Sequence, residues 1–216
     1  MPDLSFQIEN AEPQRFTAAA TLLFKLRLSN SVPGEVIHSV ALRSQIQLEV
    51  TKRKYTAEDQ NHLRDLFGET ERWGQTLKTM LWTHASVVAP AFKDTCVVDV
   101  PVPCTFDFNV AATKYFHGLG DGEVPLSFLF SGTVFYEDAH GALQVAPIPW
   151  DKEARFRLPV KSWHDMMDIY YPNSAWLCLR RDVFERLYEY KVAHGIPTWE
   201  QALERLLPAL EEATRR

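Results

Sequence analysis

Residues 96–136 constrain the fold more than any other stretch, because apolar and polar side chains alternate through most of them. In the second half, the apolar residues that share one parity are Val124, Leu126, Phe128, Phe130, Val134 and Tyr136. Period-two alternation of this length is typical of strands that bury one face. Between the halves, the glycine-rich segment 118–122 supplies residues that tolerate the positive φ angles of a chain reversal. The stretch therefore predicts a long antiparallel hairpin at the centre of a sheet.

Further alternating segments predict additional strands, which cover residues 4–9, 21–28, 36–50, 82–88, 143–147 and 154–160. Thr56-Ala57-Glu58-Asp59 resembles a helix capping box, so one short helix is expected at about 56–67. The basic run Lys52-Arg53-Lys54 is interpreted as the solvated end of a strand. About eight strands joined by short turns favour an antiparallel β-sandwich of two sheets over a βαβ fold.

From residue 161 onward the apolar spacing becomes helical. A continuous apolar stripe is formed by Trp199, Ala202, Leu203, Leu206, Leu207 and Leu210. Pro208 lies within this stripe and is expected to kink or end the helix. The predicted fold class is mainly β with C-terminal helices (α+β). Residues 1–160 would form the sandwich with its inserted helix, and residues 161–216 a helical annex packed on the sandwich or on a partner.

Charge and composition narrow the classes of partner. A formal net charge of −5 argues against nucleic acid and anionic membrane surfaces. Apolar runs of membrane-spanning length are absent from the sequence, and the N-terminus lacks the basic and apolar regions of a signal peptide. Three scattered cysteines indicate reduced thiols. These features predict a soluble, cytoplasmic protein without a membrane span.

Catalytic and metal-binding motifs are missing from the sequence. The seven histidines do not form an HxxxH or HExxH pattern. The segment Gly118-Leu119-Gly120-Asp121-Gly122 lacks the Lys-Ser/Thr pair of a phosphate-binding P-loop. Asp165 and Asp168 lie beside His164, but a solvated polar helix face explains them as well. We therefore expect no cofactor, no metal and no catalytic residues.

Large aromatic residues gather near the expected ends of elements and in loops. Aromatic side chains in such places anchor protein partners or stack on sugars and planar ligands. The candidate residues for partner or ligand binding are Trp82, His84, Trp150, Trp163, His164, Tyr170, Tyr171, Asn173 and Trp176. The alternative is that these rings fill the seam between the sheets and the helical annex, and burial preferences favour this alternative.

Several short motifs resemble a known bacterial family. They include Leu66-Phe67-Gly68-Glu69-Thr70, Leu81-Trp82-Thr83-His84 and Tyr171-Pro172-Asn173-Ser174-Ala175-Trp176-Leu177. The resemblance, to the family catalogued as domain of unknown function 6084, extends over nearly the whole chain. It implies an accessory role, since such proteins are often encoded near uptake nickel–iron hydrogenases, and it supplies no catalytic residue.

Three functions remain open, in decreasing order of preference. The first is a non-catalytic accessory, assembly or interaction protein whose partner is a protein, such as a hydrogenase subunit or maturation factor, with homo-oligomerisation as a further possibility. The second is a β-sandwich module that binds a small molecule or a carbohydrate through the same aromatic residues. The third is an enzyme with a site assembled from dispersed residues such as His84, His164, Asp165 and Asp168.

Overall fold

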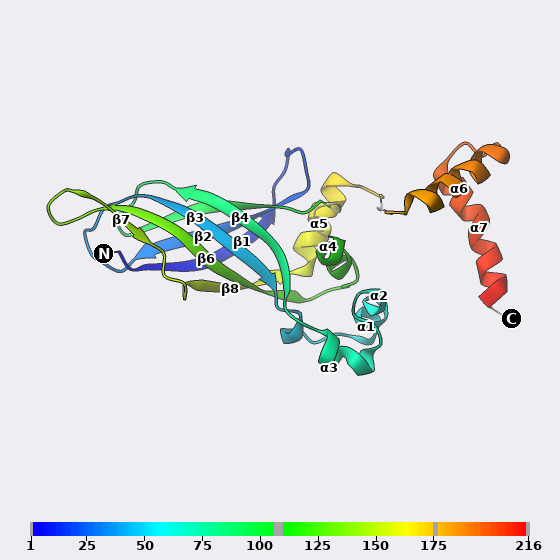
Figure 1. The fold of residues 1–216 in the computed structure, drawn as a ribbon, viewed down its shortest axis with the longest axis horizontal. Helices are drawn as coiled ribbons and strands as arrows, with labels where there is room; N and C mark the ends of the chain where they lie inside the picture. Colours follow the sequence, from blue (N-terminus) through cyan, green and yellow to red (C-terminus); the bar gives the residue numbers. More distant parts are fainter. Residues whose placement is uncertain (1, 106–109, 175–176, 215–216) are drawn as a thin grey trace. The chain divides into compact units, whose positions relative to one another are not determined.

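The computed structural model of the chain describes residues 2–105, 110–174 and 177–214, with residues 208–214 as backbone alone. In these residues the strands form a three-stranded and a five-stranded antiparallel sheet (Figure 1). The predicted fold class, mainly β with C-terminal helices, is confirmed. The chain divides into two compact units, residues 1–174 and 175–216. The first unit contains both sheets and also helix α5 (Val160–Tyr170), which the sequence analysis assigned to the annex.

The smaller sheet has the strand order β1 (Leu4–Pro13), β2 (Thr21–Asn30) and β5 (Thr95–Pro103). Its central strand, β2, shows how the alternation separates a buried face from an exposed one. The side chains on its inner face are fully buried, namely Leu22, Phe24, Leu26 and Leu28. On the outer face Lys25 forms an ion pair with Asp99 of β5 at 2.7 Å. One face thus joins the core while the other carries charges toward solvent.

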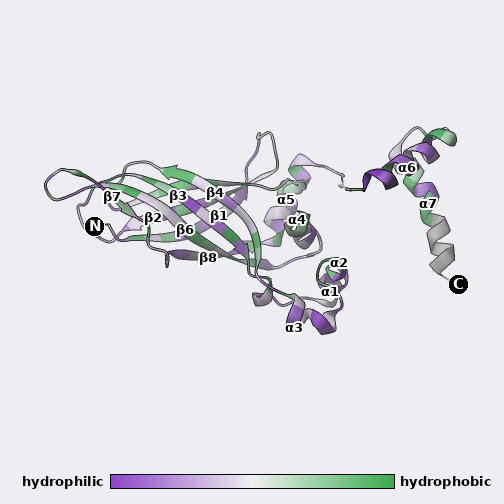
Figure 2. Ribbon diagram, in the orientation of Figure 1, coloured by the Kyte–Doolittle hydropathy of each residue, from purple (hydrophilic) through white to green (hydrophobic). Residues whose placement is uncertain are grey.

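The larger sheet is built around β6 (Glu123–Glu137). On one side β6 pairs with β3 (Ile37–Leu48), which in turn pairs with β4 (Met80–Ala89). On its other side β6 pairs first with β8 (Glu153–Pro159) and then with β7 (Leu143–Pro147). Figure 2 shows hydrophobic and hydrophilic residues alternating along these strands, as expected for a sheet with one buried face.

The predicted hairpin across residues 96–136 is wrong. β5 pairs with β2 and β6 pairs with β3, so the two strands belong to different sheets. Between them lies helix α4 (Val110–His117), which buries Ala112, Tyr115 and Phe116 at the i, i+3 and i+4 spacing of a helix. The glycine-rich segment 118–122 therefore connects a helix to a strand. The expected strand residues 106–109 lie outside the described residues.

The insertion between β3 and β4 contains a helix where one was predicted, but it is divided. It consists of η1 (Val50–Lys52), α1 (Ala57–His62), α2 (Arg64–Phe67), η2 (Thr70–Arg72) and α3 (Trp73–Thr76). The capping box is confirmed, since the Thr56 hydroxyl accepts from the Asp59 amide and the Asp59 carboxylate accepts from the Thr56 amide, both at 3.1 Å.

Helices α4 and α5 lie at one end of the sandwich unit (Figure 1), and an aromatic cluster joins them to the sheets. Phe24 of β2 packs edge-on against Trp82 of β4, with ring centroids 6.1 Å apart. Trp82 contacts Phe116 of α4 at 5.1 Å, and Phe116 stacks on Trp163 of α5 at 5.5 Å. Since such rings bury large areas, this cluster fixes α4 and α5 to the sandwich.

The second compact unit contains α6 (Arg181–Ala193) and α7 (Trp199–Thr214). Pro208 was expected to kink or end the last helix, and the second of these alternatives is wrong, because α7 continues through this residue to Thr214. Proline removes a single backbone donor from the hydrogen-bond ladder, and the turns on either side retain theirs. Rings of Phe184 and Trp199 meet at 5.2 Å between the two helices.

Candidate functional site

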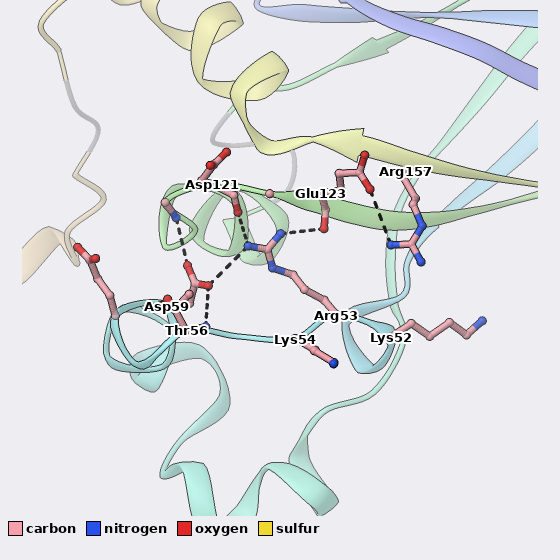
Figure 3. Close-up of a pocket in the computed structure, with 11 residues that line it drawn as sticks. Lys52, Arg53, Lys54, Thr56, Asp59, Asp121, Glu123 and Arg157 are labelled. Atoms are coloured by element: carbon pink, nitrogen blue, oxygen red, sulfur yellow. Dashed lines mark hydrogen bonds and ion pairs between the residues drawn. The ribbon is translucent and has the colours of Figure 1, made fainter.

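A polar cleft of about 750 Å³ lies in the sandwich unit, where the segment from η1 to α1 meets the loop before β6 and strand β8 (Figure 3). The residues that line it are Lys52, Arg53, Lys54, Thr56, Glu58, Asp59, Gly120, Asp121, Gly122, Glu123 and Arg157. Its size suits a small molecule. What the cleft can bind depends on which of its charged groups already form ion pairs or hydrogen bonds within the protein.

Arg53 is the central group of this wall. Its Nη1 donates to the Glu123 carbonyl at 2.8 Å, and its Nη2 donates to the Asp121 carbonyl at 2.5 Å. Nη2 also lies 3.6 Å from Asp59 Oδ2, and the two side chains are only 7% and 5% exposed. The prediction that the basic run is solvated is therefore wrong for Arg53, while Lys52 and Lys54 point away from the ion pair (Figure 3).

Asp59 connects Arg53 to the loop that precedes β6. Its second oxygen, Oδ1, accepts a hydrogen bond from the Gly120 amide at 3.1 Å. Burial raises the pKa of Asp59, but the hydrogen bonds from Thr56 and Gly120 together with the Arg53 charge outweigh burial and leave the pKa below its ordinary value. The carboxylate is therefore ionised at neutral pH, and the Arg53–Asp59 pair ties α1 to the loop that precedes β6.

Two of the outer basic residues of the cleft are also paired. Arg157 Nη1 lies 3.8 Å from Glu123 Oε2, and Lys52 Nζ lies 3.1 Å from Glu49 Oε2. Among the described lining residues, Thr56 supplies a hydroxyl, but this hydroxyl already caps α1. Over the described residues, no group of three His, Cys, Asp or Glu side chains is placed to hold a metal ion. The cleft wall thus acts as a structural clamp and shows no paired nucleophile and base.

Two of the candidate aromatic residues are buried. Trp82 and Trp163 belong to the aromatic cluster around Phe116 and face the core. They fill the seam between the sheets and helices, which is the alternative that the sequence analysis favoured on burial. A partner cannot reach them while the sandwich is intact.

Two other candidates make specific internal hydrogen bonds. His164 Nε2 lies 2.9 Å from the Leu119 carbonyl, and the neighbouring Asp165 is paired with Lys161 at 2.6 Å. Tyr170 donates to the Gln14 carbonyl at 2.6 Å. These contacts position α5 against the loops of the sandwich unit.

The remaining candidates that the structure describes lie on different elements. Trp150 in the β7–β8 connection is 94% exposed, and His84 and Asn173 are exposed on other elements. Tyr171 is half-buried against the core. Trp176 lies outside the described residues. The eight candidates that the structure describes therefore lie in the core, on helix α5, on strand β4 and in loops.

The sequence analysis missed a different feature, which is the apolar surface of the second unit. In this unit the buried apolar side chains among the described residues are Ile196 and Ala202. Large apolar side chains that remain exposed are Leu177, Phe184, Tyr188, Val192, Leu203 and Leu207. Both helices carry apolar and polar residues side by side (Figure 2). The apolar stripe of α7 was recognised in the sequence, and its exposure could not be read from the pattern.

The fold and these surfaces define a class: a two-sheet β-sandwich with a clamped polar cleft and a separate helical pair that carries exposed apolar residues. The chain belongs to a family described as "Family of unknown function (DUF6084)", whose sequence model matches residues 1–215. No curated protein matches the chain. Every helix in the described ranges is too short or too polar to cross a lipid bilayer.

Three solved structures show a weak similarity to the chain. The CARDB domain of a Pyrococcus furiosus protein, in complex with di-metal ions, is 12% identical with a TM-score of 0.28, and the match covers 73% of this chain and 91% of that one. A protein classed as late embryogenesis abundant is 13% identical with a TM-score of 0.34, covering 74% and 73%. A Kluyveromyces marxianus β-glucosidase is 8% identical with a TM-score of 0.22, covering 72% and 15%. Scores this low carry no functional argument.

Proposed function

We propose that this protein is a non-catalytic interaction or assembly protein, and that α6 and α7 are its docking element for a protein partner. The observation that supports the proposal is the exposed apolar surface of the helical unit. Leu207, for example, is 57% exposed, and α6 has no buried residue among its described side chains. Apolar surface left in water on a small unit marks an interaction site.

Physical considerations of size support the same conclusion. The unit spans residues 175–216, and compact units of about 40 residues usually need disulfides, metals or association for stability. Cys178 is the single cysteine of this unit, so an internal disulfide is excluded. Burial of the apolar residues against a partner would supply the missing stabilisation, at about 1.5–3 kcal/mol for each fully buried leucine.

The partner to test first comes from the family resemblance. Because such proteins are often encoded near uptake nickel–iron hydrogenases, we propose a hydrogenase subunit or maturation factor as the partner. Amphipathic helices commonly bind by laying their apolar face into a hydrophobic groove. A partner with such a groove would fit both helices of the unit.

The test uses the full chain with a tag, expressed together with the hydrogenase gene cluster. Leu203→Glu places a charge on the apolar face of α7, and Gln201→Glu adds the same charge at an exposed position of the same helix. We expect Leu203→Glu to reduce recovery of the hydrogenase protein at least about tenfold, since burying an unpaired carboxylate in an apolar interface costs more than the 1.4 kcal/mol of a tenfold change. Gln201→Glu should leave recovery unchanged. Equal recovery with both variants, or a wild-type chain that elutes only as free monomer, would contradict the proposal.

A further inference from the structure

The loop between β1 and β2 presents Phe16 to solvent. Its side chain is 100% exposed, although the flanking strands place their apolar residues in the core. Figure 1 shows this loop projecting from the end of the sandwich unit where α5 lies. Single exposed apolar residues are common on protein surfaces, so exposure alone indicates little.

The backbone of Phe16 is the second observation. It has a φ of 61°, in the left-handed region. Among the described non-glycine residues, Asn173 is the other one with positive φ, and asparagine tolerates this region well. A bulky aromatic residue does not, because its Cβ approaches the following carbonyl oxygen. Such a conformation persists only when the surroundings impose it, and strained residues of this kind are concentrated at functional positions.

Contacts on both sides of Phe16 impose the conformation. On one side, the Gln14 carbonyl accepts a hydrogen bond from the Tyr170 hydroxyl at 2.6 Å. On the other, the Thr17 amide donates to the same hydroxyl at 3.1 Å, and the Thr17 hydroxyl also contacts it. The hydrogen of the Thr17 hydroxyl is donated to the Ala19 carbonyl at 2.8 Å. Tyr170 of α5 thus holds the backbone on either side of Phe16 and fixes the direction of its Cα–Cβ bond.

We propose that Phe16 is a preorganised anchor that inserts its ring into an apolar pocket of a partner protein, where an acidic side chain at the pocket rim pairs with Arg15. Arg15 is exposed and adjacent to Phe16. Aromatic residues and arginine are enriched in the buried centres of protein interfaces. Because the backbone at Phe16 is already held in place, the loop loses little conformational freedom on binding, which increases affinity.

The occupant is a protein rather than a lipid surface. The chain carries a net charge of −5, which opposes approach to anionic headgroups. This site lies in the sandwich unit and does not include any residue of α6 or α7, so it goes beyond the docking role proposed above.

The test begins with photo-crosslinking in the full-length protein. p-Benzoylphenylalanine replaces Phe16 in one variant and the nearby exposed Ala18 in a control. Mass spectrometry identifies the protein crosslinked at position 16, and this protein is then purified and titrated calorimetrically against wild-type chain, Phe16→Asn and Tyr170→Phe. Leu203→Glu is titrated in parallel, so failure of the helical docking surface is distinguished from failure of the Phe16 anchor.

We expect Phe16→Asn to weaken binding at least about tenfold while raising the melting temperature by about 2–4 °C, because asparagine removes the ring and relieves the strain. Tyr170→Phe keeps the Phe16 ring but removes the hydroxyl that holds the loop, so it should weaken binding less than Phe16→Asn does. The proposal is overturned if crosslinking at position 16 does not exceed that at position 18, if the captured protein is a second copy of the chain, or if Phe16→Asn binds as tightly as wild type. Phe16-dependent sedimentation with vesicles of phosphatidylcholine and phosphatidylglycerol would also overturn it.

Discussion

Substitution of Gly132 by alanine should destabilise the larger sheet severely. Gly132 pairs with Leu42 at the interface of β6 and β3 and has a φ of 144°. A Cβ atom added there would lie 2.0 Å from the Ala41 carbonyl oxygen and 3.1 Å from the Ala41 carbonyl carbon. Both atoms belong to backbone, so they cannot rotate away as the end of a side chain could.

The magnitude follows from this geometry. A contact of 2.0 Å requires the paired strands to separate by more than an ångström, at a position where Gly132 also accepts from the Ile148 amide at 2.9 Å. Together with the positive φ, the expected loss in the free energy of unfolding is about 4 kcal/mol or more. For a unit of this size that corresponds to a decrease in melting temperature of about 8–16 °C.

The assay is urea and thermal unfolding followed by circular dichroism. Gly74→Ala is the matched control, since Gly74 lies in helix α3 and no atom lies within 4 Å of an added Cβ. The control should be unchanged or more stable by about 0.5–1 kcal/mol. A Gly132→Ala protein within about 1 kcal/mol of wild type would show that the strands accommodate the methyl group and would refute the reasoning.

Three further predictions concern the clamp and the thiols. Arg53→Met removes one partner of the buried pair and should lower the free energy of unfolding in urea by about 3 kcal/mol, because Asp59 stays buried and two carbonyls lose their donor. A double-mutant cycle of Arg53→Met and Asp59→Asn that shows no coupling energy would contradict this prediction. The pKa of Asp59 is lowered in the folded state. The ionised carboxylate therefore contributes its full stabilisation of the folded protein above the ordinary pKa of about 3.9, and this contribution is lost as the pH falls through the folded-state pKa. Acid titration of wild type and Asp59→Asn would detect the difference. Burial raises the pKa of the Cys104 thiol to about 12, whereas Cys178 is exposed, so a disulfide reagent at pH 8 should modify Cys178 in the native protein and Cys104 only after unfolding; equal rates in the native state would be inconsistent with the fold.

Period-two patterns predicted which faces of the strands are buried, and they did so well. The inner residues of β2 and β6, such as Phe24 and Phe128, are fully buried as the alternation requires. The same patterns could not identify the pairing of strands, because alternation shows which face is buried but not which strand lies beside it. β5 and β6 were therefore placed in one hairpin, although helix α4 separates them and each pairs in another sheet.

Site residues were harder to predict for a related reason. Arg53 reads as one member of a charged run, and only the return of the loop before β6 brings two carbonyls and Asp59 to its guanidinium. The residues next to Phe16 in the sequence do not indicate its left-handed conformation, since Tyr170 from α5 imposes this conformation. In both cases the decisive contact joins residues far apart in the chain, which local spacing cannot report.

The position of β6, with β3 on one side and both β7 and β8 on the other, has a consequence for synthesis of the protein on the ribosome. β3 is synthesised long before its partner β6, because Val40 pairs with Val134 and Leu48 with Leu126. Until then the β3–β4 pair exposes an unpaired strand edge, which is a template for association with other nascent chains. Long-range pairing of this kind slows folding, so the newly made chain depends on protection during elongation more than a helical protein of equal length would.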